Sequence, residues 1–195
     1  MGLARCCERL HMKNLWRAAA VAVVFLCAPY AHAAGLVPAK TTTVVVTATA
    51  LKSTSSFSGY CWTASIASSR ADAYRCMVGN IIHDPCFMLD AKSVACPIDP
   101  AENTGIRIAL TKPLPQANPG NARNAWMMQL AGQVKCNIGT GTVTPGYPFY
   151  CSGGLVCAAP PANTEQPAVF VACGRPKNAT SVTSAGRYLV TAMYE

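Results

Sequence analysis

The sequence predicts a mainly β protein: a single compact, disulfide-stapled domain of short antiparallel strands with one short helix. Short apolar segments separated by Pro and Gly follow one another from residue 59 onward, a pattern typical of β-rich domains. Eight of the eleven cysteines lie beyond residue 33, and an even number predicts disulfide crosslinks. The 162 residues (195 − 33) beyond that point suffice for one hydrophobic core.

The start of the chain has the features of a cleavable export signal. Residues 12–33 begin with two cations, continue with an apolar stretch and end in the small-x-small cleavage motif at 31–33. The apolar stretch is too short for a stable membrane span, which needs about 20 apolar residues. We predict that residues 1–33 are a signal peptide, with Met1 and Met12 as alternative translation starts, and that the protein is exported to the periplasm or the extracellular space.

Two further regions follow the predicted signal. Residues 34–58 are rich in Thr, Val and Ser, which predicts an extended segment, either an edge strand or a tether. We expect a flexible linker there and a disulfide-rich β domain over 59–195. The net charge of +8 is scattered, with no run of five basic residues, so the sequence does not support a nucleic-acid partner.

Local patterns predict the first elements of the domain in order. Ser69 precedes a short helix over 70–78, with Gly79 as its stop. Repeated prolines over 80–104 predict a disulfide-pinned loop. The alternation of apolar and polar residues over 105–112 predicts a strand.

The remaining elements are a loop and a series of strands. Pro, Asn and Gly predict a loop over 113–124. The segments 126–130 and 134–138 flank a short Gly-containing turn and predict a hairpin. Further strands are expected over the segments 147–151, 167–173 and 187–194.

The cysteines predict four disulfides, because structural disulfides persist in the oxidising compartments that exported proteins reach. Zinc is the alternative explanation, but the sequence has no two-residue C-x-x-C knuckle. The pairing is open; sequential pairing would close loops of about 10 to 16 residues, each worth about 3 kcal/mol. The cysteines concerned are Cys61, Cys76, Cys86, Cys96, Cys136, Cys151, Cys157 and Cys173.

Several segments resemble a family of uncharacterised exported bacterial proteins, mainly actinobacterial. The segments are CWTASIASSRADAYRCMVGNIIHDPCF (61–87), VACP (94–97), IRIALTKPLP (106–115) and AWMMQLAGQVKC (125–136). The likeness covers about residues 59–151 and is densest between DAYRC and DPCF. It implies one exported domain, and it carries no activity or cofactor over to this chain.

Candidate catalytic residues are few. His83 is the one histidine beyond residue 33 and stands beside Asp84, which suggests a small cell-envelope hydrolase that uses this pair or another pair of carboxylates. Neighbouring side chains usually point apart, and the serine-hydrolase patterns G-x-S-x-G and S-x-x-K are absent. We therefore predict no catalytic residue, no metal and no cofactor, and keep the hydrolase as the alternative function.

An interaction surface is the remaining candidate site. If Cys61 pairs with Cys76, then Trp62, Tyr74 and Arg75 come together as residue types enriched in binding hot spots. The alternative is that Trp62 and Tyr74 pack in the core against the disulfide. We expect a binding or interaction module for an unknown protein or cell-envelope ligand, with no nucleic acid as partner and no stable membrane span after processing.

Overall fold

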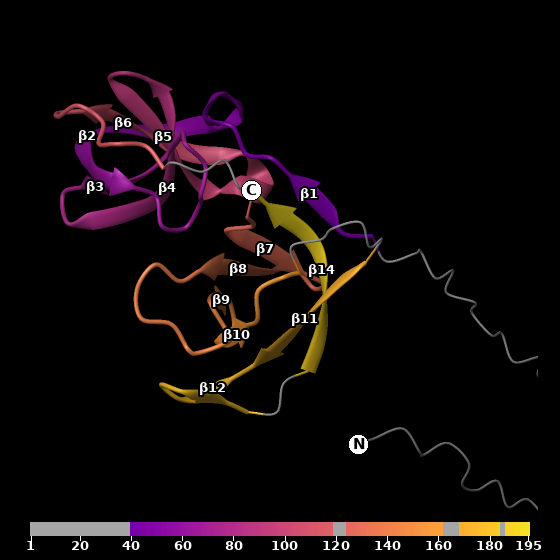
Figure 1. Ribbon diagram of the computed structural model, residues 1–195. Coiled ribbons are helices and arrows are strands. Elements are labelled where there is room, and N and C mark those ends of the chain that lie inside the picture. The colour runs from indigo at the N-terminus through magenta and orange to yellow at the C-terminus, as the bar shows by residue number, and fades with distance from the viewer. Residues whose placement is uncertain (1–39, 119–123, 162–167, 184–185) are drawn as a thin grey trace, which may run out of the picture. The chain divides into compact units, whose positions relative to one another are not determined.

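The computed structural model describes residues 40–118, 124–161, 168–183 and 186–195 (Figure 1). The predicted signal peptide lies outside the described residues. The prediction of a mainly β, disulfide-stapled fold is confirmed, because the described residues form fourteen strands and two short 3₁₀ helices. The strands are organised in two closed arrangements that follow one another along the chain.

The first arrangement is a five-stranded barrel. Consecutive strands pair antiparallel, and the barrel closes where its first strand runs parallel to its last. Buried residues of the barrel, including Val94 and Ile108, form one apolar cluster with four cysteines. The strands are β2 (Lys52–Ala64), β3 (Ala73–Val78), β4 (Ile81–Asp90), β5 (Ser93–Asp99) and β6 (Thr104–Leu110).

The second arrangement is a seven-stranded sheet that also closes on itself, because β7 pairs with β14. Its order is β1-β14-β11-β10-β9-β8-β7, and Phe149, Met128 and Val190 are fully or almost fully buried in its core. The strands are β1 (Thr42–Val44), β7 (Met127–Leu130), β8 (Val134–Ile138), β9 (Phe149–Cys151), β10 (Leu155–Cys157), β11 (Val169–Gly174) and β14 (Gly186–Tyr194).

Four short elements complete the described fold. The strands β12 (Pro176–Asn178) and β13 (Ser181–Val182) form a separate hairpin. The 3₁₀ helix η1 (Ala48–Ala50) precedes β2, and η2 (Pro100–Glu102) joins β5 to β6. The side chain of Asp99 caps η2 by accepting a hydrogen bond from the backbone N–H of Ala101 at 3.2 Å.

Four disulfides join neighbouring strands, two in each arrangement, and among the described residues none joins one arrangement to the other. All four connect cysteines that are consecutive in the sequence, so the sequential pairing is the one observed. Three of them link residues that lie directly opposite in register. The disulfides are Cys61–Cys76 (β2–β3), Cys86–Cys96 (β4–β5), Cys136–Cys151 (β8–β9) and Cys157–Cys173 (β10–β11).

A third apolar cluster joins the two arrangements. Phe87 and Ala73 of the barrel meet Met127 and Tyr194 of the second sheet there, with Val46 of the segment before β2. These side chains are at most 5% exposed. The cluster therefore fixes the β4–β5 side of the barrel against the start of β7, where the candidate site lies.

The expected helix over 70–78 is wrong, because residues 73–78 form β3. Tyr74 and Cys76 alternate into the barrel core, and Cys76 is crosslinked to Cys61 on the paired strand. Burial of this face and the cross-strand disulfide outweigh the weak local preference for a helix.

The expected loop over 80–104 is also wrong, since β4 and β5 occupy most of it. Its prolines are accommodated where the pairing is irregular. Asp84 and Pro85 lie opposite the single residue Arg75, which makes a β-bulge in β4. A proline that cannot donate to the ladder is tolerated at such a position.

The described part of the expected linker belongs to the fold rather than to a tether. Residues 42–44 pair with β14, and residues 52–58 form the first half of β2 and pair with β6. The β-branched residues of this segment do favour extended structure, but the strands that pair with them lie far along the chain.

The other strand predictions are confirmed. The strand expected over 105–112 is β6, and the hairpin over 126–138 is β7 and β8. The three further expected strands correspond to β9, β11 and β14. The described residues of the expected loop over 113–124 contain no strand or helix.

Replacing Gly59 by alanine should lower the free energy of unfolding by about 1–3 kcal/mol, because the added methyl would overpack the barrel. A Cβ at this position would lie 2.2 Å from the carbonyl oxygen of Met77 and 3.0 Å from Cγ2 of Ile108. The matched control is Gly141→Ala, whose Cβ would have no neighbour within 4 Å. Urea denaturation of the two variants measures the difference, and equal stabilities would contradict this close approach of β2 to β3.

Candidate binding site

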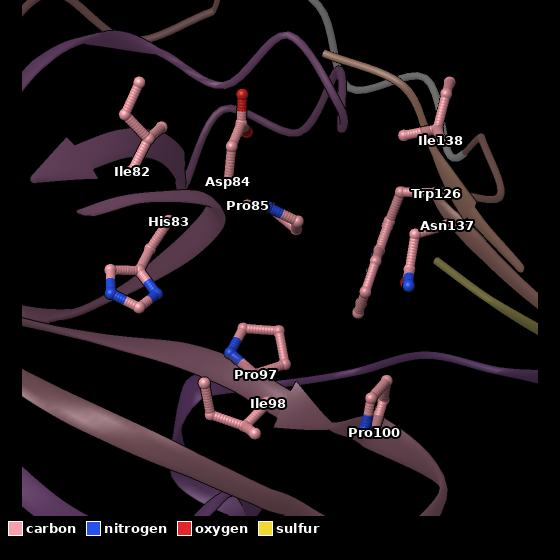
Figure 2. Close-up of a pocket in the computed structure, with 10 residues that line it drawn as sticks. All are labelled: Ile82, His83, Asp84, Pro85, Pro97, Ile98, Pro100, Trp126, Asn137 and Ile138. Atoms are coloured by element: carbon pink, nitrogen blue, oxygen red, sulfur yellow. The ribbon is translucent and has the colours of Figure 1, made fainter. Parts of the chain in front are cut away.

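A cavity of about 230 Å³ lies between the barrel and the second sheet (Figure 2). Trp126, Asn137 and Ile138 line it from one side, where β7 begins and β8 ends. Residues of β4, β5 and η2 line it from the other side. The cavity therefore exists only because the two arrangements pack against each other through their shared apolar cluster.

The barrel side of the cavity is mainly apolar. Three proline rings line it, from Pro85 in the bulge of β4, Pro97 in β5 and Pro100 in η2. Ile82 and Ile98, which are 46% and 59% exposed, lie at the same cavity. Proline rings and isoleucine side chains offer rigid hydrocarbon surface but no hydrogen-bonding side-chain atom.

Trp126 supplies the feature that most suggests a ligand. Its side chain is only 4% exposed, and its indole N–H has no hydrogen-bond partner in the described part of the chain. The ring packs on Phe87, with 6.2 Å between the centroids. Its backbone is held on both sides, since its N–H donates to Tyr194 at 3.0 Å and its carbonyl accepts from Ile138 at 2.8 Å.

A buried donor without a partner costs about 1–3 kcal/mol, so most buried polar atoms in folded proteins are paired. Trp126 lines a cavity large enough to admit part of a ligand. An acceptor atom of a ligand that bonded this N–H would recover the lost interaction. The indole N–H is thus an unpaired donor buried beside the cavity, with almost no exposed surface of its own.

The predicted pair His83 and Asp84 lies at this cavity but does not form a catalytic dyad. The two side chains point to different sides of β4 (Figure 2), and no hydrogen bond joins them among the described residues. Burial lowers the pKa of His83 below its usual value. The imidazole is therefore held in its neutral form at pH 7.

Asp84 instead holds a neighbouring loop. Its side chain is 2% exposed, accepts hydrogen bonds from the hydroxyl of Ser65 and the backbone N–H of Ile66, and lies 3.9 Å from Nε of Arg75. Burial raises the pKa of Asp84, and these partners oppose the shift. Ser65 in turn accepts from the backbone N–H of Ser68 at 2.9 Å. The carboxylate therefore anchors the residues that join β2 to β3.

The expected interaction surface is divided between two faces of the barrel. Trp62 is 39% exposed and Arg75 lies over its ring at 5.5 Å, so these two share the outer face. Tyr74 is 5% exposed and belongs to the barrel core. Tyr74 is therefore not available to a partner, whereas Trp62 and Arg75 are adjacent to each other on the surface.

The sequence indicates His83 and Asp84 but not Trp126 or Asn137, the polar side chains that line the cavity from the second sheet. No motif surrounds either residue. The one signal in the sequence is the recurrence of Pro85, Pro97 and Pro100 in a segment that is otherwise strand-forming. Prolines in such a segment indicate bulges and strand ends, which often lie beside binding sites.

No family model, curated protein or solved structure matches this chain. The resemblance to exported actinobacterial proteins therefore stays a prediction that depends on the quoted motifs. Among the residues that the structure describes, no helix is long and apolar enough to cross a membrane.

Proposed function

We propose that this protein is an exported, disulfide-stabilised binding module that holds one unit of a cell-envelope ligand in the cavity beside Trp126. The observation that carries the proposal is the preformed cavity lined by Trp126, Asn137 and His83, with the unpaired indole N–H buried beside it. Binding sites commonly combine apolar side chains with a few well-placed polar groups; most residues that line this cavity are apolar, while polar atoms make up most of its exposed surface.

The lining indicates the chemistry of the bound unit. The amide of Asn137 offers both donor and acceptor, His83 is neutral at pH 7, and the indole N–H of Trp126 becomes available as a donor once a shift of the ring exposes it. The oxygens of Asp84 are already bonded to Ser65 and Ile66. A neutral group that combines hydrocarbon faces with hydroxyl or carbonyl acceptors, such as a sugar ring, fits these surroundings.

The size of the cavity suggests that it takes only part of a ligand. At about 230 Å³ it is smaller than the roughly 300–1,000 Å³ of typical small-molecule sites. A single ring of a longer molecule is therefore the appropriate occupant. Polysaccharides of the cell envelope present such rings to an exported protein.

Export itself is supported by the cysteines. All eight cysteines beyond residue 33 form disulfides in the structure, and each arrangement of strands contains two of these four disulfides. Such crosslinks persist in the periplasm and outside the cell but are rare in a reducing cytoplasm. Together with the predicted signal peptide, they favour a site of action outside the cytoplasm.

The Trp126→Phe variant should bind a neutral oligosaccharide about fivefold more weakly, because it lacks one hydrogen bond worth about 1 kcal/mol. The probes are oligomers of N-acetylglucosamine and of glucose, titrated into the purified protein. Binding is followed by the NMR signal of the Trp126 indole N–H, which should shift strongly on saturation.

The matched control is Tyr150→Phe, which removes the hydroxyl group of an aromatic side chain that does not line the cavity. The hydroxyl of Tyr150 donates to the carbonyl of Thr142 at 3.2 Å, and this variant should bind like the unmodified protein. The proposed function would be contradicted if the indole signal did not shift with any neutral probe. The oligosaccharide concentrations must be well above the dissociation constants typical of weak glycan binding.

A further inference from the structure

We propose that the outer face of β2 and β3 beside the cavity is a second subsite, which binds acidic units of the same ligand and makes that ligand an acidic polysaccharide. We call the residues Tyr60, Trp62, Arg75 and Lys112 the aromatic–cation face. The inference rests on the proposed function, because it requires that the cavity holds a neighbouring sugar unit of the same polysaccharide.

Two aromatic rings form the centre of this face. Tyr60 and Trp62 are two residues apart on β2, and Trp62 lies in a β-bulge, without an opposite residue on β3. Their rings meet edge to face, with 6.4 Å between the centroids. Trp62 is 39% exposed, although burial of so large an apolar side chain would stabilise the fold. Exposed aromatic rings of this kind are enriched in binding surfaces.

A cation lies at each ring. Nζ of Lys112 is 4.3 Å from the centroid of Tyr60, and the guanidinium carbon of Arg75 is 5.5 Å from that of Trp62. Lys112 forms no ion pair with any described residue, whereas Arg75 is 3.9 Å from the carboxylate of Asp84. The face therefore combines stacking surface with positive charge, and the charge of Lys112 is not neutralised by the protein.

The aromatic–cation face is continuous with the cavity. Met77 lies opposite Tyr60 on one side and opposite Ile82 on the other, so the three residues form a row across β2, β3 and β4. The hydroxyl of Tyr60 is 3.7 Å from the sulfur of Met77. Ile82 also lines the cavity. Two strand spacings separate the ends of this row, about 10 Å, a distance that only a ligand of several units can cover.

Charge complementarity identifies the occupant. Aromatic rings bind the hydrocarbon faces of sugar rings, and the two cations favour carboxylate groups. The residues beyond the predicted signal peptide carry 12 Lys and Arg against 7 Asp and Glu, and this net charge of +5 (12 − 7) adds a long-range attraction for a polyanion. Single-stranded nucleic acid also pairs stacking with negative charge, but it requires a longer basic groove than two cations, so the acidic polysaccharide is the better fit.

The test measures binding of polygalacturonate, an acidic polysaccharide, to the purified full chain at low and moderate salt. Trp62→Ala should weaken binding about tenfold, because one exposed stacking ring is lost. Lys112→Gln should weaken binding and also reduce its dependence on salt, because one exposed charge contact is lost. Both variants should bind the neutral oligosaccharide like the unmodified protein.

The chain offers a matched control pair. Arg187 lies over the ring of Phe170 at 5.1 Å on the second sheet, and Phe170 is 44% exposed. Phe170→Ala and Arg187→Gln therefore remove a similar aromatic–cation contact away from β2 and β3, and they should leave polygalacturonate binding unchanged.

The possible failures are distinguishable. If Trp62→Ala and Lys112→Gln bind polygalacturonate as tightly as the unmodified protein, or if the control pair weakens binding equally, the second subsite is refuted while the cavity proposal stands. Tighter binding of single-stranded oligothymidylate than of polygalacturonate would refute the polysaccharide assignment. Loss of neutral binding in Trp126→Phe alone supports the cavity, and absence of all neutral binding refutes the proposed function on which this inference rests.

Discussion

Removal of both disulfides of the second sheet should cost about 6 kcal/mol, because each closes a loop worth about 3 kcal/mol. The loops span 15 and 16 residues, and seven of the eight disulfide cysteines are buried in the two cores. A net stability of about 5–15 kcal/mol is typical of a domain, so the loss should leave the sheet unfolded or nearly so. The variant combines Cys136→Ala, Cys151→Ala, Cys157→Ala and Cys173→Ala.

Denaturation by guanidinium chloride, followed by circular dichroism, measures the effect. The comparison variant replaces Cys86 and Cys96, whose disulfide closes a loop of 10 residues, and it should lose only about 3 kcal/mol. If the fourfold variant unfolded at the same denaturant concentration as the unmodified protein, the strand pairing and the apolar core alone would hold the second sheet.

The cysteines of each disulfide must be replaced together. Sγ of Cys151 lies 3.2 Å from Sγ of Cys157 in the neighbouring disulfide, and these atoms lie within 4.8 Å of Sγ of Cys136. In a single Cys136→Ala variant, the free thiolate of Cys151 would attack Sγ of Cys157, forming Cys151–Cys157 and releasing Cys173 as a thiolate. Peptide mapping without reduction would detect this exchange.

The strands that could be predicted are those whose pattern is local. The hairpin over 126–138 and the strand β6 carry apolar alternation and turn residues within a few positions of each other. β3 was predicted as a helix because its strand character depends on Cys61, fifteen residues away. The first half of β2 has the composition of a linker, and the strand that pairs with it, β6, lies about fifty residues further along the chain.

The candidate site could not be predicted for the same reason. Trp126 meets Pro85 and Pro97 only because two closed arrangements pack against each other, and no local pattern encodes that contact. The sequence did indicate Trp62 and Arg75, since the predicted disulfide between β2 and β3 brings them together. It could not assign Tyr74 to the opposite face, because the register of β2 and β3 decides which side chains point inward.

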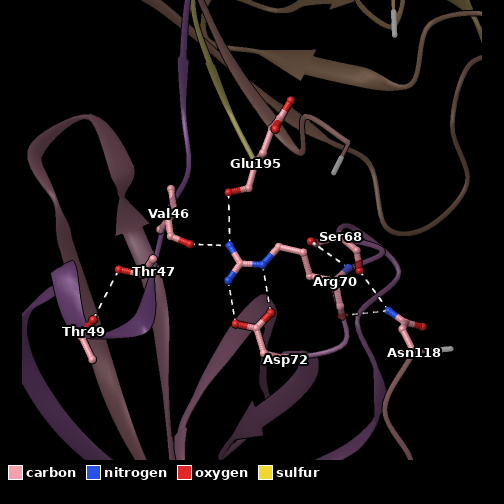
Figure 3. A network of polar contacts seen from close by, with 8 residues as sticks. All are labelled: Val46, Thr47, Thr49, Ser68, Arg70, Asp72, Asn118 and Glu195. Atoms are coloured by element: carbon pink, nitrogen blue, oxygen red, sulfur yellow. Dashed lines mark hydrogen bonds and ion pairs between the residues drawn. The ribbon is translucent and has the colours of Figure 1, made fainter. Parts of the chain in front are cut away.

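The side chain of Arg70 joins segments of the described chain that lie far apart in the sequence (Figure 3). Its guanidinium binds both carboxylate oxygens of Asp72, at 2.9 and 2.6 Å, and lies 4.3 Å over the ring of Phe87. It also donates to the backbone carbonyls of Val46 and of Glu195, the latter at 3.3 Å. One side chain thus joins the segment before β2, the approach to β3 and the last residue of the chain.

Arg70→Ala should lower the free energy of unfolding by about 3 kcal/mol, chiefly because two backbone carbonyls lose a charged donor. The side chain of Arg70 is only 14% exposed, whereas that of Asp72 is 37% exposed, so water replaces part of the lost ion pair. Arg70→Lys should recover only part of the loss, because an ammonium group cannot bind a carboxylate in a bidentate manner while it reaches two carbonyls.

Arg107→Ala provides the matched control. Arg107 pairs with Asp90 at 3.4 Å, but both side chains are about half exposed, so its loss should change stability by less than about 0.5 kcal/mol. Hydrogen exchange gives a second readout, since the amide of Val46 donates to Glu195 at 2.9 Å and should lose protection first in Arg70→Ala. Equal stabilities for Arg70→Ala and Arg107→Ala, with Val46 still protected, would show that the apolar cluster fixes these segments without the guanidinium.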